Sequence, residues 1–191
     1  MNGGGGGAST VTDRRHRLIG IGAAMVLVAV AVILAFAGGG EDGEVPPVVD
    51  STPHLVDAGE LTDLEFTLGH EVFWAGERPP AQLELTEEAG GSVYLRYLPA
   101  DVAEGDERGF LTVGTYPVVE AEAATRRFAR GAGARVLAGP GDAAVVPNPE
   151  SRGSVYLAYP GSELQIEVYD PDPAEALELV RSGAIRPVGE G

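Results

Sequence analysis

The sequence predicts an α+β protein, with one exported domain of two duplicated halves preceded by a single transmembrane helix. Three observations lead to this fold class. A long apolar run precedes the domain, a five-residue segment recurs within it, and helical and alternating apolar patterns follow one another in both halves. The expected domain is an antiparallel sheet with helices on one face, and each half has the order α-β-β-β-β.

The apolar run comprises residues 18–37 and contains no charge and no proline. Twenty helical residues span about 30 Å, the thickness of the hydrocarbon core of a bilayer. Arg14, Arg15 and Arg17 precede the run, and acidic residues follow it. Because basic residues stay on the cytoplasmic side, we expect a single-pass signal anchor in the cell membrane with the C-terminal part outside. The alternative is a cleaved secretory signal, which would release a secreted domain after Ala37.

The run divides the chain into four parts. Residues 1–17, which include five consecutive glycines, are predicted to be a disordered cytoplasmic stub. Residues 38–53 are rich in Gly, Pro and acidic residues and are predicted to be a flexible linker. Residues 54–191 are predicted to form one extracytoplasmic domain, because 138 residues suit one domain better than two.

An internal repeat organises the predicted domain. The segment GSVYL at 91–95 recurs at 153–157, an offset of 62 residues. Further along, residues 113–117 match 166–171 at an offset of 53, with one extra residue before the proline. The shorter offset assigns the length difference to a loop at 99–109, and matches in the same order favour a duplication.

Three helices are expected where apolar residues recur with a period of 3.6 between capping residues. The first begins at the cap Asp57 and ends at Gly69, the middle one lies between Pro117 and Gly131, and the last begins at Asp172. Asp caps accept hydrogen bonds from the first turn, and Gly adopts the left-handed conformation that ends a helix.

The expected strands alternate between apolar and mixed residues. In the repeated segment, Val93 and Leu95 point to one face, and Tyr94 and Arg96 point to the other. An antiparallel sheet with one apolar and one mixed face follows from this pattern, with the helices expected on the apolar face.

Composition excludes several classes of protein. The chain has no cysteine and a net charge of −16, and beyond residue 17 it carries 28 acidic against 10 basic residues. A disulfide framework and a thiolate metal site are therefore excluded. An acidic surface repels nucleic acid, so we expect no nucleic-acid partner. The expected partners are the lipid bilayer, through residues 18–37, and an envelope protein or glycan.

The sequence contains no recognisable catalytic constellation. His70 and Glu71 are adjacent, so on a strand they would point to opposite faces. The acidic loop at 101–107 lacks the carboxylate spacing of a calcium-binding EF-hand loop. We therefore assign no catalytic, cofactor-binding or metal-ligating residue, and expect no cofactor.

Aromatic residues supply the candidate contact face. Exposed rings on a sheet can stack on sugars or on the apolar surface of a partner, although such rings also pack across strands. The candidate residues are Trp74, Tyr94, Tyr116, Tyr156 and Tyr169.

A resemblance covers residues 72–171. The segments VFWAG, VYLRYLP, FLTVGTYP, SVYLAYP and QIEVYDP, in this order, resemble uncharacterised single-pass membrane proteins of GC-rich actinobacteria. The resemblance implies a fold and a location, and it brings no activity, cofactor or catalytic residue.

Two classes of function remain. The first is a membrane-tethered extracytoplasmic domain that acts as a non-enzymatic interaction or sensory module. The alternative is an envelope-acting hydrolase or cation-dependent enzyme that uses His70 and the acidic loop at 101–107.

Overall fold

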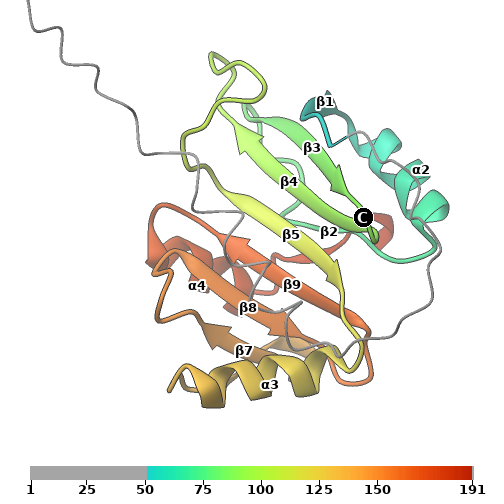
Figure 1. The fold of residues 1–191 in the computed structure, drawn as a ribbon. Coiled ribbons are helices and arrows are strands. Elements are labelled where there is room, and N and C mark those ends of the chain that lie inside the picture. Colours follow the sequence, from blue (N-terminus) through green and yellow to red (C-terminus); the bar gives the residue numbers. More distant parts are fainter. Residues whose placement is uncertain (1–50, 191) are drawn as a thin grey trace, which may run out of the picture.

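A computed structural model describes residues 51–190 of the chain (Figure 1). Eight strands form one antiparallel sheet in the order β1-β3-β4-β5-β9-β8-β7-β6. The first half supplies β1 (His54–Val56), β3 (Gln82–Glu88), β4 (Ser92–Leu98) and β5 (Thr112–Pro117), and the second half supplies β6 (Leu137–Ala138), β7 (Ala144–Pro147), β8 (Ser154–Ala158) and β9 (Leu164–Tyr169). A separate two-stranded sheet pairs β2 (Phe73–Trp74) with β10 (Arg186–Pro187).

A pseudo-two-fold axis passes through the centre of the large sheet, where β5 pairs with β9. Gly114 lies opposite Glu167, and the flanking pairs are Val113 with Val168 and Thr115 with Ile166. Adding the 53-residue repeat offset to Val113 gives Ile166, and adding it to Thr115 gives Val168. The repeat therefore exchanges the two flanking pairs. The two halves share one continuous sheet, and the axis is perpendicular to it.

The strand register defines two faces of the sheet. Residues directly opposite one another share a face, so Val93, Thr115, Ile166 and Leu157 lie on one side. We call this side the apolar face, since it holds most of the buried Leu, Ile and Val side chains. The opposite side, the mixed face, carries Tyr94, Arg96, Glu167, Tyr156 and their neighbours along the strands.

Two helices cover the apolar face. Leu61 and Leu64 of α2 (Ala58–Leu68) pack with Val93 and Leu95 over the first half, near β1. Asp57 and Glu60 form a capping box at the start of α2, and Gly69 ends it with φ 70°.

The second half of the apolar face is covered by α4 (Pro173–Arg181). Its buried Leu179 and Val180 belong to the same core cluster as Val155 and Ile166.

The third helix, α3 (Ala121–Gly131), lies on the mixed face beside β7 and β8 (Figure 1). Thr125 Oγ1 accepts a 2.6 Å hydrogen bond from Gln165 Nε2 of β9, and Phe128 packs edge-to-face on Tyr156 of β8. Ala121 joins a buried cluster that includes Ala158. The inward side of α3 is therefore matched to the polar and aromatic residues of the mixed face.

The fold class expected from the sequence is wrong. The described residues form an eight-stranded antiparallel sheet with three helices, and these helices do not lie on one face. Periodicity located the middle helix but could not show which face of the sheet it covers. Its inward residues Thr125 and Phe128 contact Gln165 and Tyr156 of the mixed face. The two halves also differ, since β2 leaves the large sheet to pair with β10 whereas β6 stays at its edge.

The membrane predictions are corrected as well. Between residues 51 and 190 the structure contains no helix that is long and apolar enough to cross a bilayer. The expected signal anchor and the cell-membrane location therefore have no counterpart in the described part of the chain. The segment on which they depend, 18–37, lies outside the described residues, as do the stub at 1–17 and most of the linker at 38–53.

Candidate functional site

The loop at residues 99–111, which joins β4 to β5, folds back over the mixed face of the first half. Its anchor is an ion pair between Arg96 and Glu84, whose Nη1 and Oε1 atoms lie 2.5 Å apart, and the Glu84 side chain is fully buried. Glu84 also accepts a 2.5 Å hydrogen bond from the backbone N–H of Gly105. Arg96 donates to the backbone carbonyls of Asp106 and Arg108 at 2.5 and 3.0 Å. The buried pair thus holds the loop on the sheet.

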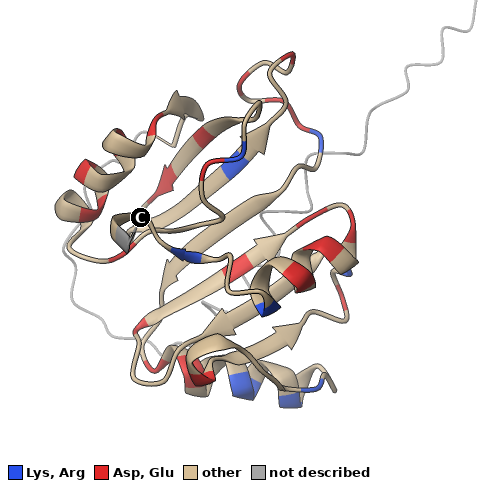
Figure 2. Ribbon diagram, turned by 180° about the vertical axis from the view of Figure 1, so that it is seen from behind, with Lys and Arg blue, Asp and Glu red and all other residues tan. Residues whose placement is uncertain are grey.

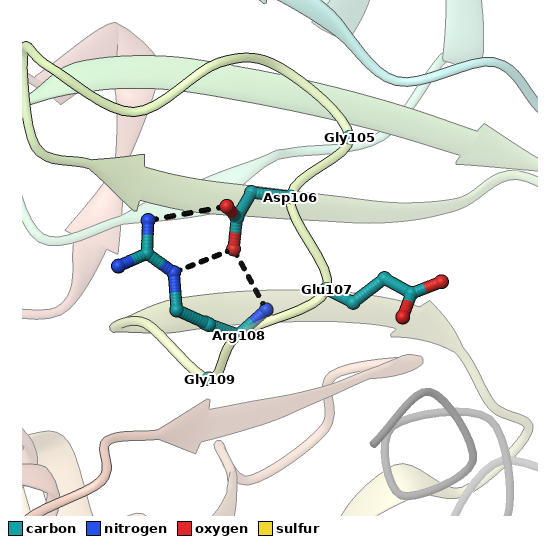
Figure 3. A pocket seen from close by; sticks show the side chains of 5 residues that line it. All are labelled: Gly105, Asp106, Glu107, Arg108 and Gly109. Carbon is teal, nitrogen blue, oxygen red and sulfur yellow. Dashed lines mark hydrogen bonds and ion pairs between the residues drawn. The ribbon is translucent and has the colours of Figure 1, made fainter. Parts of the chain in front are cut away.

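The far part of this loop lines an open pocket, formed by Gly105, Asp106, Glu107, Arg108 and Gly109 (Figure 3). Asp106 accepts hydrogen bonds from Arg108 Nε at 2.9 Å and Nη2 at 3.1 Å, and these bonds lower the pKa of the partly exposed Asp106 carboxyl. Glu107 points away from this pair (Figure 3). The carboxylate of Asp106, which lines the pocket, is therefore already paired with Arg108.

The pocket does not form a metal centre. Within the part of the chain that the structure describes, no three His, Cys, Asp or Glu side chains are grouped so that they could hold a metal ion. The loop at 101–107 holds its carboxylates in pairs with arginine or in solvent, and calcium needs six to eight oxygen ligands.

His70 lies at the other end of β4 from this loop. Its ring nitrogens lie 2.8 Å from the carbonyl oxygen of Glu71 and 3.0 Å from that of Gly91. Seven strand residues at about 3.3 Å each place the two ends of β4 roughly 20 Å apart. The histidine and the acidic loop are therefore not brought together, and no shared catalytic site exists between them.

Four of the five rings proposed as a contact face are buried. Trp74, Tyr94, Tyr116 and Tyr156 are at most 7% exposed, and the partly exposed ring of Tyr169 packs against Gly109 and Gly153. These four rings are therefore not available for stacking on a sugar or a partner. The sequence could not show this, because the burial depends on contacts with separate segments: α3 packs on the three tyrosines, and α2 packs on Trp74.

The buried tyrosines surround Glu167, a residue that the sequence analysis did not single out. Its Oε2 accepts a 2.8 Å hydrogen bond from the hydroxyl of Tyr116, and it is also hydrogen-bonded to Tyr156 and Ser154. Burial raises the pKa of the Glu167 carboxyl, and these hydrogen bonds offset part of that rise. The alternation of β9 placed Glu167 on the mixed face, but only the coverage of that face made it a buried group.

Glu167 lies on the pseudo-two-fold axis, opposite Gly114. A Cβ atom at Gly114 would clash with the hydroxyl of Tyr116, so the glycine makes room for the ring that donates to the carboxylate. Tyr94 packs edge-to-face on Tyr116 with ring centroids 5.6 Å apart. This polar cluster fills the centre of the mixed face and joins the two halves.

The outer side of α2 carries the most exposed large apolar residue of the described chain. Phe66 is 92% exposed, whereas Leu55 of the edge strand β1, which is 44% exposed, lies opposite Glu84 on the mixed face. Phe66 lies outside the apolar stripe formed by Leu61, Leu64 and Leu68. This position in the sequence indicates that its side chain faces solvent. The helix that carries it is acidic: Glu60, Asp63 and Glu65 lie on α2, and residues 51–77 contain no Lys or Arg.

The outer side of α3 has the opposite charge (Figure 2). Ala123, Arg126, Arg127 and Arg130 are exposed on one side of this helix. Val119 and Val136, which are 73% and 36% exposed, flank its two ends. The total charge of the sequence does not reveal this separation of acidic and basic helices.

Comparisons with known proteins give no relative: no protein family, no curated protein and no solved structure matches the chain. The resemblance to uncharacterised single-pass proteins stays a prediction.

Proposed function

We propose that the domain described by residues 51–190 is a non-enzymatic protein-interaction module whose contact surface is the outer side of α2. The observation that carries this proposal is the 92% exposure of Phe66. An aromatic ring of this kind buries about 150–250 Å² when a partner covers it, so it can anchor an interface.

The local contacts support a role outside folding. Phe66 lies opposite the buried side of α2, where Leu61 and Leu64 pack into the core. Because the ring is almost fully exposed, its replacement should change the free energy of unfolding by less than about 0.5 kcal/mol.

The charge of the surface indicates what kind of partner it suits. Asp63 is exposed one turn before Phe66, Glu60 is exposed in the first turn of the same helix, and residues 51–77 contain no Lys or Arg. Such a surface repels anionic polymers and attracts a partner with a basic rim and an apolar centre. A protein fits these requirements better than a glycan, since four of the five rings expected to stack on sugars are buried.

The enzymatic alternative has less support. The two ring nitrogens of His70 lie beside backbone carbonyl oxygens, and the acidic loop lies at the opposite end of β4. A hydrolase needs a base and an orienting carboxylate close to its nucleophile, and this arrangement separates them.

Site-specific photocrosslinking in the full chain tests the proposal. A photoreactive phenylalanine analogue replaces Phe66 in one variant and Glu178, which is exposed on α4, in a matched control. We expect a discrete protein adduct from position 66 that is absent from position 178, and we expect Asp63→Arg in the same chain to reduce it several-fold. Equal adducts from both positions, or none from position 66, would overturn the proposal.

A further inference from the structure

Exposed large apolar residues lie on or beside two helices of opposite charge. We define the α2 surface as Glu60, Asp63, Phe66 and Thr67. We define the α3 surface as Val119, Ala123, Arg126, Arg127, Arg130 and Val136. Of the four exposed large apolar residues of the described chain, Phe66 lies on the α2 surface and Val119 and Val136 lie on the α3 surface, whereas Leu55 is opposite Glu84 on the mixed face.

The charges of the two surfaces are complementary. Four of the ten arginines that follow residue 17 lie within 126–135. Arg126 pairs with Glu122 at 2.8 Å, and Arg127 lies 3.7 Å from Glu120. With respect to the other described residues, Arg130 and Arg135 form no ion pair. The α3 surface therefore has positive charge available for an acidic partner, and Asp63 offers such a charge on the α2 surface.

The shapes of the side chains are also compatible. Phe66 projects from its helix, whereas the first turn of α3 exposes the small Ala123, and Arg126 and Arg127 lie one turn further along the same side. Guanidinium groups stack on aromatic faces and attract them through cation–π interactions. A phenylalanine that packs on Ala123 would thus contact Arg127 on the same side of the helix.

One molecule cannot make this contact within itself. The α2 helix covers the apolar face near β1, whereas α3 lies on the mixed face near β7, at the other end of the sheet (Figure 1). The two surfaces therefore face different directions. A contact between them joins two copies head to tail, and each added copy leaves one free surface of each kind.

We propose that the partner of the α2 surface is the α3 surface of a second copy of this chain, so that copies associate head to tail. This inference rests on the proposed function and deepens it by naming the partner. The face of one 11-residue helix is a small interface, so the contact is weak and reversible. The net charge of −16 opposes association at low ionic strength. At about 0.15 M salt the Debye length is roughly 8 Å, so the facing charges dominate.

Two variants of the full chain test the proposal. In the first, Phe66→Ser and Asp63→Arg block the α2 surface, and in the second, Arg126→Glu, Arg127→Glu and Arg130→Glu block the α3 surface. All five positions are exposed, so circular dichroism and thermal unfolding should show both variants folded. The proteins are kept in a non-ionic detergent, because the apolar run at 18–37 is present.

The expected result follows from the head-to-tail geometry. The unmodified chain forms assemblies that grow beyond dimers as concentration rises in sedimentation at 0.15 M salt. Each blocked variant alone stays monomeric, and an equimolar mixture of the two forms a dimer that grows no further. A monomeric unmodified chain at several hundred micromolar would overturn the inference. Dimers of the α3-blocked variant alone would also overturn it, since they would show contact between two α2 surfaces.

The absence of cysteine in the chain allows a second measurement. Copies with Asp63→Cys are mixed with copies carrying Arg127→Cys and oxidised mildly. We expect the mixed disulfide to exceed both homodimers several-fold, whereas a random 1:2:1 distribution would contradict the geometry. If the photoreactive group at position 66 captures a different protein while the chain stays monomeric, this inference fails and the proposed function stands.

Discussion

The two halves of the sheet cover the same face in different ways. On the mixed face of the first half, Glu84 of β3 lies directly opposite Arg96 of β4. In the second half, the residue 62 positions after Arg96 is Ala158, and it lies opposite Ala144. A charged pair thus occupies the position that two alanines occupy in the other half.

This difference explains what covers each half. The alanines leave room for α3, and both Ala144 and Ala158 are fully buried. The charged pair leaves less space, but its donors and acceptors bind the backbone of the loop at 99–111. The comparison teaches that one strand framework accepts either a helix or a loop, depending on whether small or charged residues face outward.

The largest expected effect comes from breaking the charged pair. Glu84→Ala leaves Arg96 partly buried without its carboxylate and removes the acceptor for Gly105. We expect the free energy of unfolding to fall by about 3–5 kcal/mol, as measured by denaturant unfolding. The amide of Gly105 should also exchange hydrogen faster.

The double variant Glu84→Ala/Arg96→Ala sharpens this test, because it copies the Ala144–Ala158 pair. Removing both charges should recover part of the loss, since no uncompensated charge remains. A double variant less stable than Glu84→Ala would show that Arg96 stabilises the loop without its partner.

A smaller effect is expected from crowding the other half. Ala158→Leu inserts a larger side chain beneath α3, where Ala158 is fully buried. Overpacking should lower the free energy of unfolding by about 1–3 kcal/mol in denaturant titration. Ala123→Leu, on the exposed side of the same helix, is the control and should change it by less than about 0.5 kcal/mol. Equal losses from both variants would contradict the close packing of α3 on the sheet.

The boundary between the halves can be tested through pH. Burial raises the folded-state pKa of Glu167 above its ordinary 4.5, so folding favours its neutral form. Its stabilising contribution is therefore complete below pH 4.5 and is lost as the pH rises through the folded-state pKa. Glu167→Gln should unfold a few degrees higher than the unmodified chain at pH 7, with a difference that shrinks towards pH 4. The exposed Glu163→Gln is the control, and thermal unfolding from pH 4 to 8 is the measurement.

The smallest effect is expected at the rim of the loop. Arg108→Ala removes the ion pair between Arg108 and Asp106, and the side chain of Arg108 is 66% exposed. An exposed pair of this kind contributes less than about 1 kcal/mol, so denaturant unfolding should change little. A loss as large as that of Glu84→Ala would mean that the loop depends on its rim rather than on the buried pair.

The sequence predicted local features, such as helix ends, better than it predicted which helix or loop covers each face of the sheet. The caps at Asp57 and Gly69 are set by nearby residues, and α2 begins and ends beside them. The repeat offsets agree with the β5–β9 register, because side-chain alternation and backbone pairing are local properties. Which element covers which face depends on contacts between distant segments, such as Thr125 with Gln165, and periodicity carries no information about them.

The prediction of the candidate site failed for the same reason, because the burial of its rings depends on contacts between distant segments. Tyr94, Tyr116 and Tyr156 lie on the mixed face, as their alternation requires, but α3 packs on them. The sequence shows that Phe66 is an apolar residue outside the apolar stripe of its helix. Only the structure shows that its side chain is 92% exposed. The burial of Glu167 could not be read from the sequence, because its donors come from β5 and β8.

The central pairing of β5 with β9 has a consequence for the ancestry of the chain. A protein made of one half alone would leave β5 as an unpaired edge, which readily pairs with another strand. The register that now sets Gly114 against Glu167 would then set Gly114 against Gly114 of a second molecule, with Val113 opposite Thr115 on each side. Fusion of two such genes would convert a symmetric homodimer into this single chain without changing any backbone hydrogen bond at the centre of the sheet.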